Sequence, residues 1–281
     1  MGEFFNRSFS LNLGGKLIAS ESVDGNANHP LRVVFSIERD LTREPNAAEV
    51  TIYNLSETSR AKVADRAIQA TLEAGHSGRS STIFAGRLEY GSTSRDGPDW
   101  VTTFEATDGA KELRESRINL SFQPGIGVAD VIKRAAEAMG VNVGNVADKV
   151  SSGNIRGAIQ EFGNGIVLSG NATDQFDKVA KSLGYEWSVQ DGEIQLLEQG
   201  GVTDENQAVK LTSSTGLIGS PQSGDDGVVE VRALLVPGLT PGRRVQVQSR
   251  EVDGFFRIER TVYTGDTRGQ DWYADLEVKP L

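Results

Sequence analysis

The stretch "FRIERTVYTGDTRGQDWYADLEV" (residues 256–278) decides the fold, because an earlier stretch, "GRLEYGSTSRDGPDWVTTFEA" (residues 86–106), has the same layout. From its second residue, each reads Arg, an apolar residue and Glu, and continues through a turn that contains Gly and Asp. Each then reads Asp-Trp, three residues, an apolar residue and Glu. Alternating residues on both sides of a turn predict a β-hairpin. The sequence therefore predicts the same hairpin twice.

A further element recurs in the same order around these hairpins. "AEVTIYNL" (residues 48–55) precedes the first hairpin, and a weaker echo, "VEVRALLV" (residues 229–236), precedes the second. Chance produces an ordered series of matches less readily than a single matching hairpin. We infer the duplication of a small β-barrel; the alternative is two unrelated hairpins that share common strand residues. Repeats of this length indicate architecture rather than catalysis.

The rest of the first third also reads mostly as strands. Apolar and polar residues alternate in "RSFSLNL" (residues 7–13) and in "LRVVFSIER" (residues 31–39), which predicts two strands. Ser56 is predicted to cap a short helix that runs to about Ile68. The strands of the first hairpin are expected to be joined by a polar loop over Gly91–Pro98.

The middle of the chain contains a different repeat. "GVADVIKRAAEAMGVNV" (residues 127–143) and "NATDQFDKVAKSLGYEWSV" (residues 171–189) each predict a helix, a glycine stop and a short strand. The gap-free alignment of Asp130 with Asp174 also matches Ile132 with Phe176, Ala136 with Ala180, Met139 with Leu183, Gly140 with Gly184, Val141 with Tyr185 and Val143 with Trp187. The pair Asp191-Gly192 predicts a hairpin after the second copy.

These elements predict a mainly β chain of the α+β class. Residues 1–115 are expected to form a first antiparallel β-barrel module, and residues 201–281 a second, related module. Residues 116–200 are expected to form an α/β insert built on the helix-strand pseudo-repeat.

Composition narrows the classes of function. The 281 residues are 37% hydrophobic and 24% charged, as in folded proteins. Cysteine is absent, which excludes disulfides, thiolate metal sites and cysteine catalysis. The net charge of −10 is spread along the chain without a basic cluster, so DNA or RNA binding is not expected. The sequence shows no signal-peptide pattern and no apolar run of about 20 residues, so we expect folding in the cytoplasm and no membrane partner.

Candidate cofactor, metal and nucleophile signals are poor. The Gly-Ile-Gly segment at residues 125–127 resembles the start of a dinucleotide fingerprint, but Asp130 stands where the third glycine belongs. His29 lies beside a proline and His76 in a Gly/Ser-rich stretch. Neither has a second ligand at the spacing that metal sites use, so both are expected to be solvated loop residues. No nucleophile motif is present. We therefore predict no catalytic, cofactor-binding or metal-binding residues.

The two hairpins each offer a pair of carboxylates, Glu89 with Glu105 and Glu259 with Glu277. Two carboxylates on facing strands are what a glycosidase uses. The same residues recur in both hairpins beside Arg87 and Arg257, however. Cross-strand ion pairs on a solvated face explain that recurrence more simply than catalysis does.

The three tryptophans, Trp100, Trp187 and Trp272, admit two interpretations. Their rings could stack on sugars, or they could pack in a core or at a subunit interface. Trp100 and Trp272 occupy equivalent places in the two hairpins, which favours the structural role.

Several segments resemble baseplate central hub proteins of contractile-tailed bacteriophages. "AEVTIYNLSETSRAKV" (residues 48–63) is similar to their first signature. "KLTSSTGLIGSPQSGDDGVVEVRALLVPGLTPGRRVQV" (residues 210–247) and "DGFFRIERTVYTGDTRGQDWYADLEVKPL" (residues 253–281) look like their C-terminal module. "FDKVAKSLGYEWSVQDGEIQLLEQGG" (residues 176–201) is similar to the helix and hairpin between the modules. These are packing and turn motifs and contain no active-site signature.

The resemblance implies a structural protein of the virion rather than an enzyme. Hubs of this family contain two β-barrels that are each similar to the tail-tube subunit. Three chains form a ring of six barrels, which adapts the sixfold tube to the threefold spike and lines the DNA channel. The implied partners are two further copies, the tail tube or its initiator, the trimeric spike and peripheral baseplate proteins. DNA only passes through. The implied location is the tail baseplate, assembled in the host cytoplasm.

Three alternatives stay open on the sequence. The chain could be a distal tail or hub protein of a non-contractile phage, or of a phage-derived bacteriocin or secretion device. It could be a carbohydrate-binding β module that uses the tryptophans. It could be a cell-wall hydrolase with two carboxylates.

Overall fold

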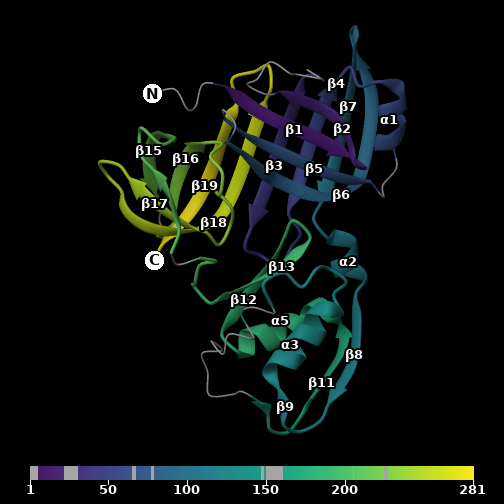
Figure 1. Cartoon of the computed structure of the whole chain (residues 1–281), viewed down its shortest axis with the longest axis vertical. Coiled ribbons are helices and arrows are strands. Elements are labelled where there is room, and N and C mark those ends of the chain that lie inside the picture. Colours follow the sequence, from purple (N-terminus) through teal and green to yellow (C-terminus); the bar gives the residue numbers. More distant parts are fainter. Residues whose placement is uncertain are drawn as a thin grey trace. The chain divides into compact units, whose positions relative to one another are not determined.

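The computed structural model describes residues 6–21, 31–64, 68–76, 79–146, 149, 161–204, 206–224 and 227–281 (Figure 1). The chain forms two compact units. The first, which we call the β unit, combines the chain up to Asp40 with Asn46–Asp108 and Val202–Leu281. The second, the insert unit, combines Leu41–Pro45 with Gly109–Gly201. The predicted mainly β class is confirmed, and His29 lies outside the described residues.

The β unit contains a sheet of 13 strands. From the N-terminal part come β1 (Arg7–Leu13), β2 (Lys16–Glu21), β3 (Val33–Asp40), β4 (Ala47–Tyr53), β5 (Gln69–His76), β6 (Arg79–Asp96) and β7 (Asp99–Thr107). From the C-terminal part come β14 (Ala208–Leu211), β15 (Leu217–Ser223), β16 (Val229–Leu234), β17 (Arg244–Gln248), β18 (Asp253–Asp266) and β19 (Trp272–Pro280). The order is β15-β16-β19-β18-β3-β4-β7-β6-β5-β1-β2, and β17 lies between β18 and β14. Only the β14–β17 pair is parallel in this sheet.

The two parts of the chain repeat one strand order. β3-β4-β7-β6-β5 in the first part corresponds to β15-β16-β19-β18-β17 in the second. The register of the repeated hairpins also agrees, because each has a β-bulge at the same place. The pairing shifts between Leu88 and Tyr90 in β6, and between Ile258 and Arg260 in β18. Bulges are local features that chance does not place alike in two hairpins. The repeat seen in the sequence is therefore a repeat of structure.

The two copies are joined in one sheet, because β18 pairs with β3. Buried residues of both copies belong to one apolar cluster, which includes Phe35 of β3, Phe104 of β7 and Leu276 of β19. Closure of each copy into a separate barrel stays a prediction.

Local signals in the first copy give a mixed outcome. Helix α1 (Glu57–Val63) begins after Ser56, whose side chain accepts a hydrogen bond from the Ser59 N–H at 3.3 Å, as predicted. The predicted loop over Gly91–Pro98 is wrong. β6 continues to Asp96 and only the two residues after it form the turn. Pairing with β7 outweighs the weak strand preference of glycine and serine there.

The insert unit packs helices together with short strands. Its elements are α2 (Ala110–Glu115), β8 (Arg117–Phe122), β9 (Ile126–Gly127), α3 (Val128–Glu137), β10 (Glu161–Phe162), β11 (Ile166–Asn171), α5 (Ala172–Ser182), β12 (Tyr185–Gln190) and β13 (Glu193–Glu198). β8 pairs with β11, β9 with β10, and β12 with β13. Apolar residues at helical spacing, including Val131, Ile132 and Phe176, are fully buried between these elements. This cluster is separate from that of the β unit.

The pseudo-repeat of the insert is confirmed for the helices but not for both strands. Gly140 and Gly184 follow the two helices, each with a φ of +77° that glycine adopts without strain. The strand predicted after Gly140 is wrong, because only Asn142 forms a bridge, with Glu193. Gly144 then turns the chain with a φ of +55° and ends the pairing. The second copy forms β12, and the hairpin at Asp191-Gly192 is confirmed.

Candidate interaction surface

One face of the sheet in the β unit carries charged residues across both copies. Side chains directly opposite each other on antiparallel strands point to the same face. The pairs Glu230–Glu277, Glu277–Arg260, Arg232–Asp275 and Asp275–Val262 connect β16, β19 and β18. The pairs Val262–Glu38, Thr264–Ser36, Ser36–Glu49 and Glu49–Glu105 extend the face over β3, β4 and β7. We call this surface the charged face.

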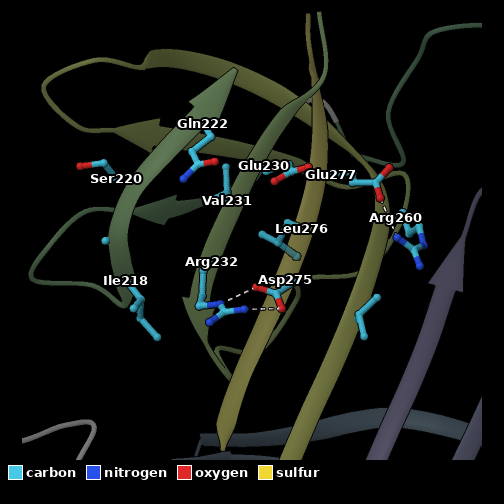
Figure 2. A pocket seen from close by; sticks show the side chains of 12 residues that line it. Ile218, Ser220, Gln222, Glu230, Val231, Arg232, Arg260, Asp275, Leu276 and Glu277 are labelled. Carbon is cyan, nitrogen blue, oxygen red and sulfur yellow. Dashed lines mark hydrogen bonds and ion pairs between the residues drawn. The ribbon is translucent and has the colours of Figure 1, made fainter. Parts of the chain in front are cut away.

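Two arginines of the second copy hold three acidic side chains of the charged face. Arg260 donates from Nε to Glu38 Oε1 at 2.7 Å and from Nη1 to Glu277 Oε1 at 2.6 Å. The hydrogen bonds to Glu38 and Glu277 raise the pKa of Arg260 above its ordinary value, so the guanidinium stays charged. Arg232 donates from Nε and Nη2 to the two Asp275 oxygens at 2.6 and 3.0 Å. The Arg260–Glu277 and Arg232–Asp275 pairs border an open groove of about 650 Å³ over β15, β16, β19 and β18 (Figure 2).

Acidic residues outnumber basic ones on the charged face. Glu49 lies opposite Glu105, and Glu230 lies opposite Glu277. Like charges directly opposite each other destabilise a sheet. Arg260 offsets this repulsion in the second copy, whereas Tyr90 stands at the equivalent place beside Glu105 in the first.

The carboxylate pairs predicted from the sequence are not formed. The bulges remove Glu89 and Glu259 from the register, so Glu105 lies opposite Tyr90 and Glu277 opposite Arg260. Glu89 Oε1 accepts a hydrogen bond from Thr107 at 3.1 Å. Glu259 Oε1 accepts one from Arg257 Nε, on the same strand, at 2.6 Å. Arg257 and Glu259 thus form an ion pair along β18. An extra residue switches the face of every later side chain in a strand. The residues after the bulge in β6, YGSTSRD (90–96), have no apolar alternation in which this switch could be seen.

Two of the three tryptophans pack in cores. Trp187 meets Phe176 edge-to-face at 5.2 Å in the insert unit. Trp272 is 3% exposed, and its Nε1 donates to the Gly75 carbonyl at 3.0 Å. Trp100, the equivalent of Trp272, is 37% exposed.

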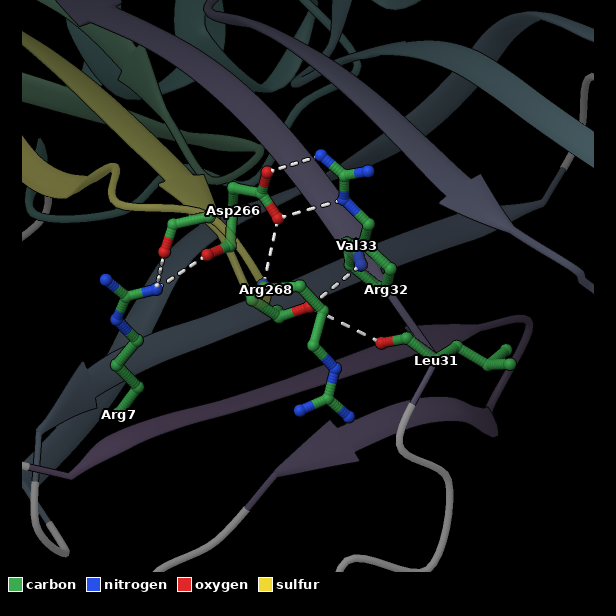
Figure 3. A network of polar contacts seen from close by, with 8 residues as sticks. Arg7, Leu31, Arg32, Val33, Asp266 and Arg268 are labelled. Carbon is green, nitrogen blue, oxygen red and sulfur yellow. Dashed lines mark hydrogen bonds and ion pairs between the residues drawn. The ribbon is translucent and has the colours of Figure 1, made fainter. Parts of the chain in front are cut away.

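The end of β18 is held by side chains of the first copy (Figure 3). Arg32 donates from Nε and Nη2 to the two carboxylate oxygens of Asp266 at 3.2 and 2.8 Å. Arg7 donates from Nη1 to the Asp266 carbonyl at 2.7 Å. The hydrogen bond from Arg32 lowers the pKa of Asp266, although burial acts in the opposite direction. The Thr267 N–H donates a hydrogen bond to the Val33 carbonyl at 3.0 Å, which continues the backbone pairing of β18 with β3.

The remaining sequence candidates form no site. His76 ends β5 and is buried, so its predicted place in a solvated loop is wrong. Gly127 caps the start of α3 after the two-residue strand β9, with none of the βαβ surroundings that a dinucleotide site needs. No cluster of three metal-ligating side chains occurs within the described ranges. None of the helices in the described part of the chain is long and apolar enough to cross a membrane.

Comparison with solved structures identifies the fold. The 43 kDa tail protein of prophage MuSo2 from Shewanella oneidensis matches with a TM-score of 0.65 and 11% identity, over 98% of this chain and 97% of that one. The tail protein from Neisseria meningitidis MC58 matches with a TM-score of 0.62 and 12% identity, over 98% and 97%. No protein-family model and no curated protein sequence matches.

A third match comes from a secretion system. The E. coli c3393 protein is described as a component of the type VI secretion system with structural similarity to the T4 phage tail proteins gp27 and gp5. It matches with a TM-score of 0.57 and 10% identity, over 96% of this chain and 76% of that one. The chain therefore has the fold of phage tail proteins, which secretion-system components share. The matched proteins are described as tail proteins and as a component of a secretion system.

Proposed function

We propose that the chain is the baseplate hub of a phage tail. Three copies form a ring that joins the sixfold tail tube to the threefold spike. The observation that carries this proposal is the duplicated strand order with the same bulge in both copies. Two equivalent copies in each of three chains present six similar surfaces to the tube and keep threefold symmetry toward the spike. Closed rings of identical chains follow the general symmetry of homo-oligomers.

The same geometry serves a secretion device of phage origin. The similarity to c3393, whose description places it in the type VI secretion system, favours this as the second candidate. The hub role is the same in both settings, and only the particle differs. A gene for a contractile sheath or for secretion-system components beside this gene distinguishes the two.

Mass photometry and negative-stain imaging test the hub role. The protein is measured alone and mixed with its candidate spike protein. We expect a three-chain ring with six lobes in at least one of the two samples. A chain that stays monomeric with the spike contradicts the proposal.

We further propose that the charged face lines the DNA channel. Its excess of acidic side chains repels the phosphate backbone, so that DNA slides past without binding. The double variant Glu49→Lys with Glu230→Lys tests this in assembled particles. Each new lysine lies opposite a glutamate, Glu105 or Glu277, so the fold gains an ion pair at each site.

We expect particles with this double variant to eject DNA several times more slowly, because the lysines in the channel wall attract the phosphates of the DNA. The matched control is Glu137→Lys with Glu161→Lys, which makes the same change of charge on exposed positions of the insert unit. Equal ejection rates for the two variants contradict the channel assignment.

A further inference from the structure

The β unit contains a pocket of about 340 Å³ that both parts of its sheet line. The N-terminal part contributes His76 at the end of β5 and Arg79 at the start of β6. The C-terminal part contributes Lys210 of β14, the turn residues Ser214 and Thr215, and the segment after β16 at residues 235–237. None of these residues belongs to the charged face.

Basic side chains form one wall of this pocket. Arg7 lies opposite His76 in the pairing of β1 with β5, and His76 lies opposite Arg79 in the pairing of β5 with β6. Side chains directly opposite each other on antiparallel strands point to the same face, so these three form a row. Lys210 adds a cation from the other part of the sheet. The described lining residues include no Asp or Glu, although the chain as a whole has a net charge of −10.

Positive charge at this wall is only partly offset within the chain. Arg7 donates to the backbone carbonyls of Asp266 at 2.7 Å and Gly269 at 2.8 Å, which are neutral acceptors. Among the described residues, no ion pair holds the ammonium group of the exposed Lys210. Like charges directly opposite each other destabilise a sheet. An anion in the pocket offsets this repulsion.

A turn with several hydroxyl groups forms a second polar wall. Thr215 Oγ1 donates to the Lys210 carbonyl at 2.7 Å and accepts from the Thr212 N–H at 2.9 Å, so the turn is fixed against β14. Ser214 Oγ lies 2.9 Å from Thr212 Oγ1. A hydroxyl group both donates and accepts, so Ser214 can accept from Thr212 and donate its own proton into the pocket.

The remaining wall is apolar. It consists of Val209 and the segment at residues 235–237, in which Leu235 is buried. The N–H of Val236 donates to the Leu234 carbonyl at 2.7 Å, which fixes this segment at the end of β16. An inorganic anion gains nothing from an apolar wall, whereas an organic anion buries its apolar part there.

We propose that this pocket binds an organic carboxylate. The carboxylate lies between Arg79 and Lys210 with the Ser214 hydroxyl as a further donor, and the apolar part of the ligand lies against residues 235–237. Charge-assisted hydrogen bonds of this kind are stronger than those between neutral groups. The same chemistry occurs at the C-terminal end of a protein chain and in small organic acids. The site does not depend on the proposed ring.

Ligand-observed NMR titrations of the full chain test the site with three probes. N-acetyl-leucine carries a carboxylate beside an apolar side chain, its amide lacks the charge, and hexanoate is an organic acid without a peptide group. We expect N-acetyl-leucine to bind about tenfold more tightly than its amide, because the amide leaves the cations without an anion. Tighter binding of N-acetyl-leucine than of hexanoate assigns the site to a chain end. Equal or tighter binding of hexanoate assigns it to small organic acids.

Substitutions locate the bound probe. Lys210→Gln and Arg79→Gln, both at exposed positions, should each weaken binding of the tighter probe about tenfold, because each removes a charge-assisted hydrogen bond. The matched control, Lys16→Gln, makes the same change of charge at an exposed position of β2 and should keep the affinity. Circular dichroism checks that all three variants are folded.

Three results overturn the proposed site. They are the absence of binding by either acid, equal binding of N-acetyl-leucine and its amide, and an affinity that both Lys210→Gln and Arg79→Gln leave unchanged. None of them bears on the hub proposal, because these titrations do not measure ring formation.

Discussion

We call the pairing of β18 with β3 the internal junction. We call the segment Tyr90–Asp96 of β6, which among the described strands pairs with β7 alone, the open edge. The two are built from equivalent strands but differ in what surrounds them. At the internal junction, Trp272 is 3% exposed and Asp266 is held by Arg32. At the open edge, their counterparts are Trp100, which is 37% exposed, and Asp96, which is exposed. The same hairpin thus packs its tryptophan in a core in one copy, whereas in the other copy Arg60 and Arg95 cover the ring only in part. Under the proposed ring, a neighbouring chain would complete the packing of the first copy.

The tryptophans give the largest expected difference between the two places. Trp272→Ala should lower the free energy of unfolding by about 3–5 kcal/mol, because it leaves a cavity in a packed core. Trp100→Ala should change it by less than about 1 kcal/mol in the isolated chain, since surface changes are usually small. Urea unfolding of both variants measures the contrast. Equal losses would show that the two sites are packed alike.

Trp100→Ala should nevertheless weaken assembly if Trp100 is covered by a neighbouring chain. Mass photometry of the folded variant provides this second measurement. If the variant forms rings at the same protein concentration as the unchanged protein, Trp100 lies outside the interface.

The carboxylates give a smaller difference of the same kind. Asp266→Asn removes the charge from two hydrogen bonds with Arg32 and should cost about 1–3 kcal/mol of stability. Asp96→Asn, at the equivalent exposed position, is the matched control and should change stability by at most about 0.5 kcal/mol. A thermal unfolding series measures both. A cost for Asp96→Asn as large as that for Asp266→Asn would contradict the comparison.

The pH dependence of Asp266 sharpens this prediction. Because the folded-state pKa of Asp266 is lowered, its contribution is present above the pKa of the unfolded chain and is lost as the pH falls through the folded value. The stability difference between the unchanged protein and Asp266→Asn should therefore shrink on acidification. A difference that grows at low pH would reverse the assigned sign.

The sequence predicted what depends on neighbours along the chain. The repeated hairpin, the Ser56 cap and the glycines after α3 and α5 are short-range signals, and the structure contains them. It did not predict what depends on partners far away. The pairing of β18 with β3 joins residues more than two hundred positions apart, and nothing local in either strand specifies it.

The same reason explains the errors at the candidate surface. The bulge at Glu89 changes which carboxylates face each other. The polar and small residues that follow it show no alternation, so the switch of faces that an extra residue causes cannot be seen in the sequence. The extension of β6 through Gly91 to Asp96 comes from pairing with β7, which overrides a composition typical of loops. His76 is buried by distant strands rather than by its Gly/Ser-rich neighbours.

The smallest expected difference lies on the charged face. Arg260→Gln removes the ion pairs with Glu38 and Glu277 and leaves Glu277 opposite Glu230 without compensation. The half-exposed setting limits the cost to about 0.2–1 kcal/mol. The first copy already has Tyr90 at this place, so the variant makes the second copy resemble the first. The loss should shrink at high salt, because ions screen both the attraction and the repulsion. Unfolding at two salt concentrations measures it, and a salt-independent loss would show that Arg260 acts through packing instead.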